Sequence, residues 1–271
     1  MLEALVGMFS YPFIVRALIG GAVISLCASL LGVSLVLKRY SMIGDGLSHV
    51  GFGAVAVASA LGLSPMGVAI PVVIIAAFLL LRMNESSKIK GDAAVAMVSS
   101  ASLAAGVIAV SVTTGINTDF YSYMFGSILG MSKGDVVLSL CVCIPVLVLF
   151  VVFYNRIFSV TFDESFARAS GVKAGLFNAV IAVLTALTVV LGMRLMGALL
   201  ISSLVIFPCL TAMRVCRSFK AVTVCAAIVS LLCFFIGMYL SVLFSLPTGA
   251  SIVGMNVLSF AVFSFIGKLA R

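Results

Sequence analysis

The sequence predicts an all-α protein, a bundle of about eight or nine transmembrane helices that forms a single transmembrane domain over residues 1–271. The composition supports this prediction, because 63% of the residues are apolar and only 9% are charged, against about 45–50% and about 25% in soluble domains. The mean hydropathy is correspondingly high, at +1.36. This composition excludes a cytosolic enzyme, a nucleic-acid-binding module, a disordered chain and a secreted disulfide scaffold.

Long apolar runs, separated by charged or turn-forming residues, predict the individual helices. A membrane helix needs roughly 20 mostly apolar residues to cross the hydrocarbon core of a bilayer. Almost no chain separates the sixth run from the seventh, so eight crossings with an interfacial N-terminal segment are an alternative to nine. The predicted spans are 12–37, 43–62, 65–83, 93–115, 135–155, 173–193, 195–213, 220–245 and 250–267.

The basic residues predict which way the bundle faces, because lysine and arginine accumulate in cytoplasmic loops. With the N-terminus outside and the C-terminus inside, the cytoplasmic segments contain every lysine and arginine except Arg16, Lys133 and Arg194. Two loops are then long enough to carry function, an outer loop at 117–133 and an inner loop at about 156–172. The outer loop is rich in aromatic residues, and both a helix that shields a pathway and a plain aromatic belt fit it.

Two ionisable residues lie within the second predicted span, where charge is costly and points to function. The run Gly44-Asp45-Gly46-Leu47-Ser48-His49 contains the protein's only histidine, four residues after Asp45. Residues four apart share one face of an α-helix, so the carboxylate and the imidazole point the same way. These groups suit Zn²⁺ well and Mn²⁺ or Fe²⁺ acceptably. They are half of a four-ligand site, which a two-fold dimer with this helix on its axis would complete.

The residues alone leave two other interpretations of Asp45 and His49 open. The two side chains could form a hydrogen-bonded pair that ties helices together, or they could carry protons as a relay. A proton relay would belong to a secondary transporter driven by protons, and a tie between helices would belong to a membrane protein of structural or enzymatic function.

The inner loop has the pattern of a short amphipathic helix. Asp163 and Glu164 favour a helix start, Gly171 favours its end, and the apolar residues Phe162, Phe166 and Ala169 are at helical spacing. Such a helix suits docking into a groove of a soluble partner. A helix that lies flat on the membrane surface fits the pattern equally well.

The chain lacks a nucleotide-binding motif of its own. The motif G-x-x-x-x-G-K-[ST] is absent, because the only Gly-Lys pair, Gly267-Lys268, has Val262 in the place of the first glycine. The zinc-protease motif H-E-x-x-H is absent as well. We therefore expect a protein that is not itself an enzyme.

Four stretches together resemble the metal-permease family of bacterial ABC importers, often called the ABC-3 family. The resemblance covers nearly the whole chain in the expected order, and the Gly-Asp-x-x-Ser-His run is its most specific part. In the version found here this run is similar to that of zinc permeases, although manganese relatives share Asp and His at the same spacing. The stretches are Lys38 to His49, Tyr123 to Leu129, Phe162 to Gly171, and Gly197 to Pro208 followed by Thr211-Ala212.

The resemblance implies a multi-pass permease of the bacterial plasma or inner membrane, with zinc, or alternatively manganese or iron, as the transported substrate rather than a cofactor. It also implies a second copy of the chain, separate cytoplasmic ATPase subunits that hydrolyse ATP, and an extracytoplasmic metal-binding protein, with lipid but no nucleic acid among the partners. Asp45 and His49 are implied to contact the passing metal. The inner loop is implied to be the coupling helix that meets the ATPase, through Asp163, Glu164, Phe166, Ala167 and Gly171.

Overall fold

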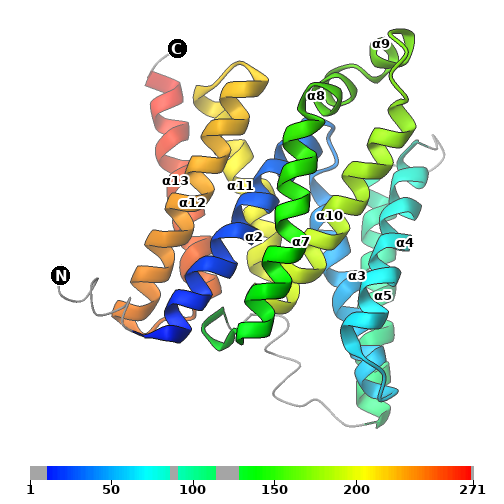
Figure 1. Cartoon of the computed structure of the whole chain (residues 1–271), viewed down its shortest axis with the longest axis vertical. Helices are drawn as coiled ribbons and strands as arrows, with labels where there is room; N and C mark the ends of the chain where they lie inside the picture. Colours follow the sequence, from blue (N-terminus) through cyan, green and yellow to red (C-terminus); the bar gives the residue numbers. More distant parts are fainter. Residues whose placement is uncertain (1–10, 86–90, 114–127, 270–271) are drawn as a thin grey trace.

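The structure, a computed structural model, describes residues 11–85, 91–113 and 128–269 and is a bundle of roughly parallel and antiparallel helices (Figure 1). These residues contain no strand, which confirms the predicted all-α fold. In chain order the elements are α2 (Pro12–Leu37), α3 (Ser41–Ala60), α4 (Pro65–Glu85), α5 (Gly91–Thr113), the 3-10 turn η1 (Ile128–Gly130), α7 (Lys133–Val152), α8 (Tyr154–Phe162), α9 (Glu164–Ala169), α10 (Ala174–Met196), α11 (Ala198–Val215), α12 (Phe219–Phe244) and α13 (Thr248–Leu269).

Nine of the helices in the described residues have at least 18 residues, and eight of these are apolar enough to cross a membrane. The exception is α3, whose polar residues and glycines lower its hydropathy. The sixth and seventh predicted spans are separate helices, because Gly197 between α10 and α11 has a φ of +93°, a left-handed backbone that glycine adopts readily. Most of the predicted outer loop, at 117–127, lies outside the described residues.

The predicted inner loop contains more helix than expected. The pattern from Asp163 to Gly171 predicted one short helix, and α9 is that helix. A second helix, α8, precedes it over Tyr154–Phe162, where the prediction extended the fifth span to 155 and then placed a loop. The cause is that apolar aromatic residues continue the hydrophobic run of α7 beyond its true end at Val152.

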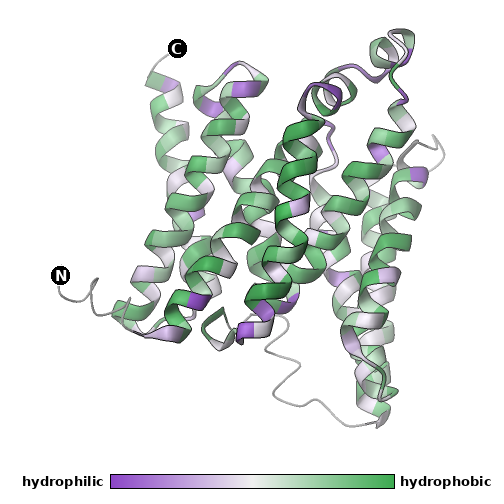
Figure 2. Ribbon diagram, in the orientation of Figure 1, coloured by the Kyte–Doolittle hydropathy of each residue, from purple (hydrophilic) through white to green (hydrophobic). Residues whose placement is uncertain are grey.

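Successive long helices run in alternating directions, so α8, α9, the start of α10 and the end of α13 share one end of the bundle, at the top of Figure 1. Hydrophilic residues gather at this end in Figure 2, while the helix surfaces between the two ends are mainly hydrophobic. Lys133 at the start of α7 and Arg194 near the end of α10 lie at the opposite end. The described basic residues are therefore grouped as the orientation prediction requires; the orientation itself, and the single domain over 1–271, stay predictions.

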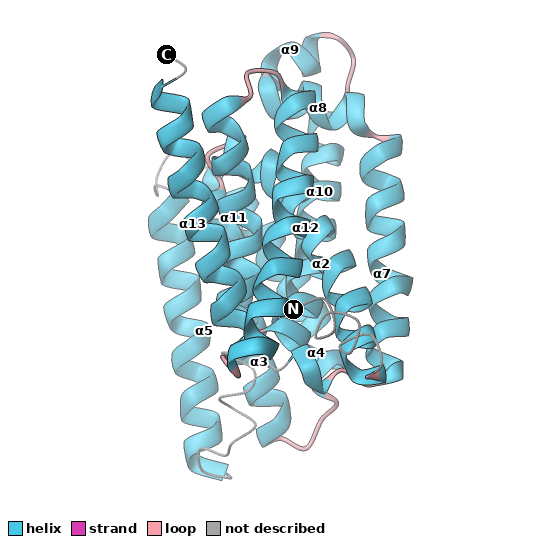
Figure 3. Ribbon diagram, turned by 90° about the vertical axis from the view of Figure 1, so that its left-hand side faces the viewer, coloured by secondary structure: helices cyan, strands magenta, loops and turns pink. Residues whose placement is uncertain are grey.

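The central helices of the bundle are α2 and α10, whose most apolar 18-residue windows are 67% buried, whereas those of α5 and α13 are 22% and 17% buried. Figure 3 shows the long helices side by side in the perpendicular view. Exposed side chains on the outer helices are large and apolar, for example Val112 on α5 and Phe265 on α13. These surfaces match the hydrocarbon of a bilayer.

Helix α3 lies very close to α5 because both have glycines at their crossing. A Cβ on Gly53 would lie 2.2 Å from the carbonyl oxygen of Ser102, and one on Gly106 would lie 2.8 Å from the Cα of Gly53. Small residues at such positions let membrane helices approach closely. The glycines around Asp45 and His49 thus pack α3 among its neighbours, and the polar α3 is held by contacts with α4, α5, α10 and α11.

Candidate functional site

Asp45 and His49 lie on one face of α3, as their spacing predicted. The Nε2 atom of His49 is 3.6 Å from Oδ2 of Asp45. The carboxylate and the imidazole are therefore close enough to bind one metal ion together, although 3.6 Å is longer than a hydrogen bond.

These two side chains form the only accessible part of their helix segment. All residues from Ile43 to Ala56 are buried except these two, whose side chains are 32% (His49) and 37% (Asp45) exposed. Between Ile43 and Ala56, the accessible side chains of α3 are thus one carboxylate and one imidazole. An ion that reaches this face meets these two groups, while the rest of the segment serves packing.

A hydroxyl from α11 orients the carboxylate of Asp45. Ser202 Oγ donates a hydrogen bond of 2.8 Å to Oδ1 of Asp45. The other oxygen, Oδ2, is the one that faces His49. Groups behind a ligand fix its direction and typically matter for metal affinity. Ser202 lies within the Gly197 to Pro208 stretch of the resemblance, and nothing in the sequence pattern linked it to Asp45.

One copy of the chain supplies an incomplete metal site. Among the described residues no group of three or more His, Cys, Asp or Glu side chains lies together. Zinc in proteins is usually four-coordinate, and its ligands are imidazole, thiolate or carboxylate groups. Asp45 and His49 provide two of these, so a zinc site here would need ligands beyond the side chains of the described residues.

The five residues that the resemblance assigns to the coupling helix have different environments. Asp163 is the N-cap of α9, and its Oδ1 accepts a hydrogen bond of 2.9 Å from the backbone N–H of Phe166. Ala167 is fully buried in a small cluster beneath α9, and Gly171 ends the segment with a φ of +80°. Phe166 is 67% exposed. Three of the residues therefore shape the segment, and Phe166 presents an aromatic ring outward.

The fifth residue, Glu164, faces the bundle rather than the solvent. Its carboxylate accepts hydrogen bonds from Asn178 of α10, at 3.0 Å, and from Arg168 of α9, and it lies 3.6 Å from the ammonium of Lys38 at the end of α2. Partial burial alone would raise the pKa of Glu164. The hydrogen bonds from Asn178 and Arg168 and the positive charges of Lys38 and Arg168 outweigh burial, so the pKa of this carboxyl lies below its ordinary value.

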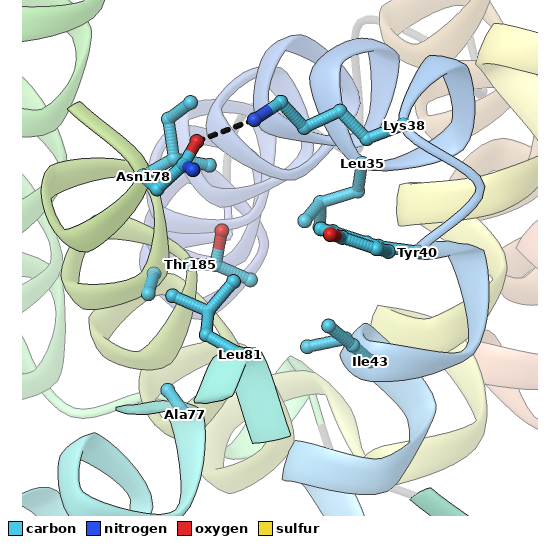
Figure 4. A pocket seen from close by; sticks show the side chains of 10 residues that line it. Leu35, Lys38, Tyr40, Ile43, Ala77, Leu81, Asn178 and Thr185 are labelled. Carbon is cyan, nitrogen blue, oxygen red and sulfur yellow. Dashed lines mark hydrogen bonds between the residues drawn. The ribbon is translucent and has the colours of Figure 1, made fainter. Parts of the chain in front are cut away.

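Lys38 and Asn178 were not predicted to meet Glu164. Lys38 was interpreted as a topology signal and as the first residue of a stretch of the resemblance. In the structure it donates a hydrogen bond to Oδ1 of Asn178 (Figure 4). The available signal was Asn178 itself, a polar side chain within the apolar span predicted at 173–193.

The sequence also contains one match to the hydrolase motif G-x-S-x-G, at Gly130 to Gly134. Its serine, Ser132, is the N-cap of α7 and donates a hydrogen bond of 2.8 Å to Asp135. A nucleophilic serine needs an adjacent base, and the protein's only histidine, His49, lies beside Asp45 in α3. Helix capping therefore accounts for this motif.

Comparison with known proteins gives consistent matches over the whole chain. A sequence model of the ABC 3 transport family matches residues 10–267. The manganese import system permease protein ScaB of Streptococcus gordonii is 29% identical over 269 residues, which cover 99% of this chain and 96% of ScaB. The high-affinity zinc uptake system membrane protein ZnuB of Haemophilus influenzae is 28% identical over 255 residues, 94% of this chain and 98% of ZnuB. The solved structure of PsaBC from Streptococcus pneumoniae in complex with Fab has a TM-score of 0.87 and 28% identity, and covers 100% of this chain and 99% of the matched one.

Proposed function

Since the chain belongs to the ABC 3 transport family, we propose that it is the permease subunit of an importer that carries zinc across the bacterial plasma membrane, with Asp45 and His49 as the groups that contact the ion. At the coarser level, the chain is a multi-pass membrane permease of an ABC metal importer and not itself an enzyme. The observation that carries the proposal is that Asp45 and His49 are the accessible side chains of α3 between Ile43 and Ala56.

A second copy of the chain is the natural source of the missing ligands. An isologous contact brings the same surface of both copies together, so it would place two Asp45 carboxylates and two His49 imidazoles around one ion. This set has two oxygens, two nitrogens and no thiolate. It fits tetrahedral Zn²⁺, and it is open enough to release the ion during transport.

Manganese is the second candidate substrate. The relatives described above are named for manganese import and for zinc uptake, so the family alone does not single out either metal. Mn²⁺ prefers oxygen ligands and a larger coordination shell, so the same four groups would need added water or carboxylate oxygens to hold it. We therefore propose zinc before manganese as the substrate, because two carboxylates and two imidazoles suit Zn²⁺ better.

ATP hydrolysis is proposed to come from separate cytoplasmic subunits, because the sequence has no nucleotide-binding motif of its own. The coupling segment contains two exposed aromatic rings, Phe162 at 75% and Phe166 at 67% exposure, and such rings are typical anchors in a partner's groove. A metal-binding protein outside the cell is proposed to deliver the ion to the opposite end of the bundle.

Growth of transporter-null cells tests the substrate and the site together. The chain is expressed with its ATPase and binding protein in cells starved of zinc or of manganese, as wild type, Asp45→Asn or His49→Ala. We expect rescue of zinc-starved cells by the wild type and loss of rescue in both variants. Asp92→Asn is the matched control, since Asp92 is an exposed carboxylate in the first turn of α5.

The other outcomes are equally informative. Rescue under manganese starvation alone would assign the permease to manganese. Full rescue by His49→Ala would remove the site proposal. Uptake that continues without any ATPase subunit would favour the alternative class, a proton-coupled secondary transporter.

A further inference from the structure

Lys38 joins three helices at the end of the bundle that carries α9. Its Nζ atom lies 3.6 Å from Oε2 of Glu164 in α9 and donates a hydrogen bond to Asn178 in α10, and Lys38 itself is the C-cap of α2. The Lys38 side chain is only 9% exposed and that of Glu164 is 31% exposed. Partly buried ion pairs are screened less by water and salt than surface pairs are, so the Coulombic attraction between Lys38 and Glu164 exceeds that of a surface pair at the same distance.

The connection between α2 and α3 is short and locked by backbone hydrogen bonds. The N–H of Tyr40 donates to the carbonyl of Leu35 at 2.8 Å, and the N–H of Arg39 donates to the carbonyl of Val36 at 3.0 Å. Arg39 has a φ of +62°. These features are those of a Schellman motif, which fixes the direction in which the chain leaves a helix. A displacement of Lys38 is therefore passed to the start of α3 instead of being absorbed by a loose loop.

The first turn of α3 lies between this corner and the candidate metal site. Asp45 is four residues after Ser41, about 6 Å along the helix axis at 1.5 Å per residue. Beside this turn is a cavity of about 10 Å³ between α2, α3, α4 and α10, whose lining includes Ile43, Leu81 and Thr185 (Figure 4). Ile43 of this turn therefore faces a small void, which has room for about one water molecule.

We propose that Lys38 is a positioning residue for transport, which transmits movement of α9 through Glu164 to the first turn of α3 and so to Asp45 and His49. This inference rests on the proposed function, because it requires an ATPase that moves α9. The two sides of α9 then differ in role, since Phe166 presents its ring outward to the partner while Glu164 holds the helix to α2 and α10.

The test uses the complete complex of the permease with its ATPase subunits in proteoliposomes, in which zinc uptake and ATP hydrolysis are measured together. Lys38→Met removes the charge and keeps the length of the side chain. We expect continued ATP hydrolysis and a fall in zinc taken up per ATP of about fivefold or more, the size of a typical coupling between sites. Lys220→Met is the matched control, because Lys220 is an exposed lysine at the same end of the bundle, and its uptake per ATP should equal that of the wild type.

Exchange of the two charges distinguishes loss of the Lys38–Glu164 ion pair from a general loss of structure. Lys38→Glu and Glu164→Lys should each lower uptake per ATP, and the double variant should recover to about half of the wild-type value or more, as expected for residues in direct contact. Lys38→Arg should behave as the wild type, and Glu164→Gln as Lys38→Met. These last two variants decide the question if any other variant fails to give a single peak in size exclusion.

Two results would overturn the inference: unchanged uptake per ATP in both Lys38→Met and Glu164→Gln, or a double charge exchange no better than its single variants. Failure of the proposed function gives a different result, since the wild-type complex would then take up no zinc or would not need ATP.

Discussion

Arg194 near the end of α10 lies 3.3 Å from Asp135 in the first turn of α7, measured from Nη2 to Oδ1. Asp135 also belongs to a capping box: its Oδ2 accepts a hydrogen bond of 3.0 Å from the backbone N–H of Ser132, whose hydroxyl accepts one from the N–H of Asp135. One carboxylate thus caps α7 and connects it to α10, at the end of the bundle opposite α9.

Loss of this carboxylate should destabilise the protein chiefly through the helix cap. We expect Asp135→Ala to lower the free energy of unfolding by about 1 kcal/mol, the usual effect of losing a cap. Arg194→Ala should cost less than half as much, because partly exposed ion pairs contribute little. Unfolding of both variants in detergent measures the difference, and equal losses would show that the ion pair dominates.

Ser202→Ala should weaken zinc transport without affecting assembly. The Ser202 hydroxyl donates a hydrogen bond to Oδ1 of Asp45. Loss of a group that orients a metal ligand typically lowers the affinity for the metal by about tenfold or more. The neighbouring Ser203→Ala is the control, since the buried Ser203 hydroxyl has no hydrogen-bond partner among the described residues. Uptake at limiting zinc should separate the two variants, and equal uptake by both would contradict the role of Ser202.

Gly53→Ala should destabilise the packing of α3 on α5. The added Cβ would lie 2.2 Å from a backbone oxygen of Ser102, and overpacking of this kind typically costs about 1–3 kcal/mol. Gly254→Ala in α13, where nothing lies within 4 Å of the new methyl group, should be neutral or stabilising. Melting temperatures in detergent compare the two, and similar values would mean that the close crossing tolerates a side chain.

The attachment of α9 to the bundle should depend on pH. A pKa of Glu164 held below its ordinary 4.5 means that the folded protein favours the charged carboxylate. The stabilisation is therefore fully present above pH 4.5 and is lost as the pH falls through the lowered pKa. Hydrogen exchange of the α9 backbone, corrected for its intrinsic pH dependence, should rise in that acidic range. Glu164→Gln should remove this transition; if it persists, another group is responsible.

Labelling of single cysteines tests the orientation. In a variant without the seven native cysteines, cysteine at position 168 or 217 should react with a membrane-impermeant maleimide only after the cells are opened, because both lie on the predicted cytoplasmic side. Cysteine at position 122, in the predicted outer loop, should react in intact cells. Reaction of positions 122 and 168 from the same side would rule out the predicted topology.

The fold was largely predictable because apolar runs determine where helices cross a membrane, and α2 begins and ends at its predicted residues. The predicted and observed helix ends differ where polar or aromatic residues determine the end of a helix. The capping box of Ser132 starts α7 two residues before the predicted span, and the aromatic residues that follow Val152 hid the start of α8. Hydropathy predicts which segments lie in lipid, whereas caps and turns determine the residues at which each helix begins and ends.

The candidate site was only half predictable. Asp45 and His49 share a face because of local helix geometry, which spacing reveals. Their partner Ser202 is 157 residues from Asp45 along the chain, and Asn178 is 140 residues from Lys38. Such contacts depend on which helices become neighbours, and a single amphipathic or apolar pattern does not contain that information.

The low hydropathy of α3 also has a consequence for biogenesis. This helix is not among the eight that are apolar enough to cross a membrane, and only a tight corner separates it from α2. Partition of a nascent segment into lipid depends on its hydrophobicity, so α3 enters the bilayer most favourably as a hairpin together with α2. We therefore expect the order of synthesis to matter, because the helices that cover the candidate metal ligands of α3, namely α4, α5, α10 and α11, all follow it along the chain.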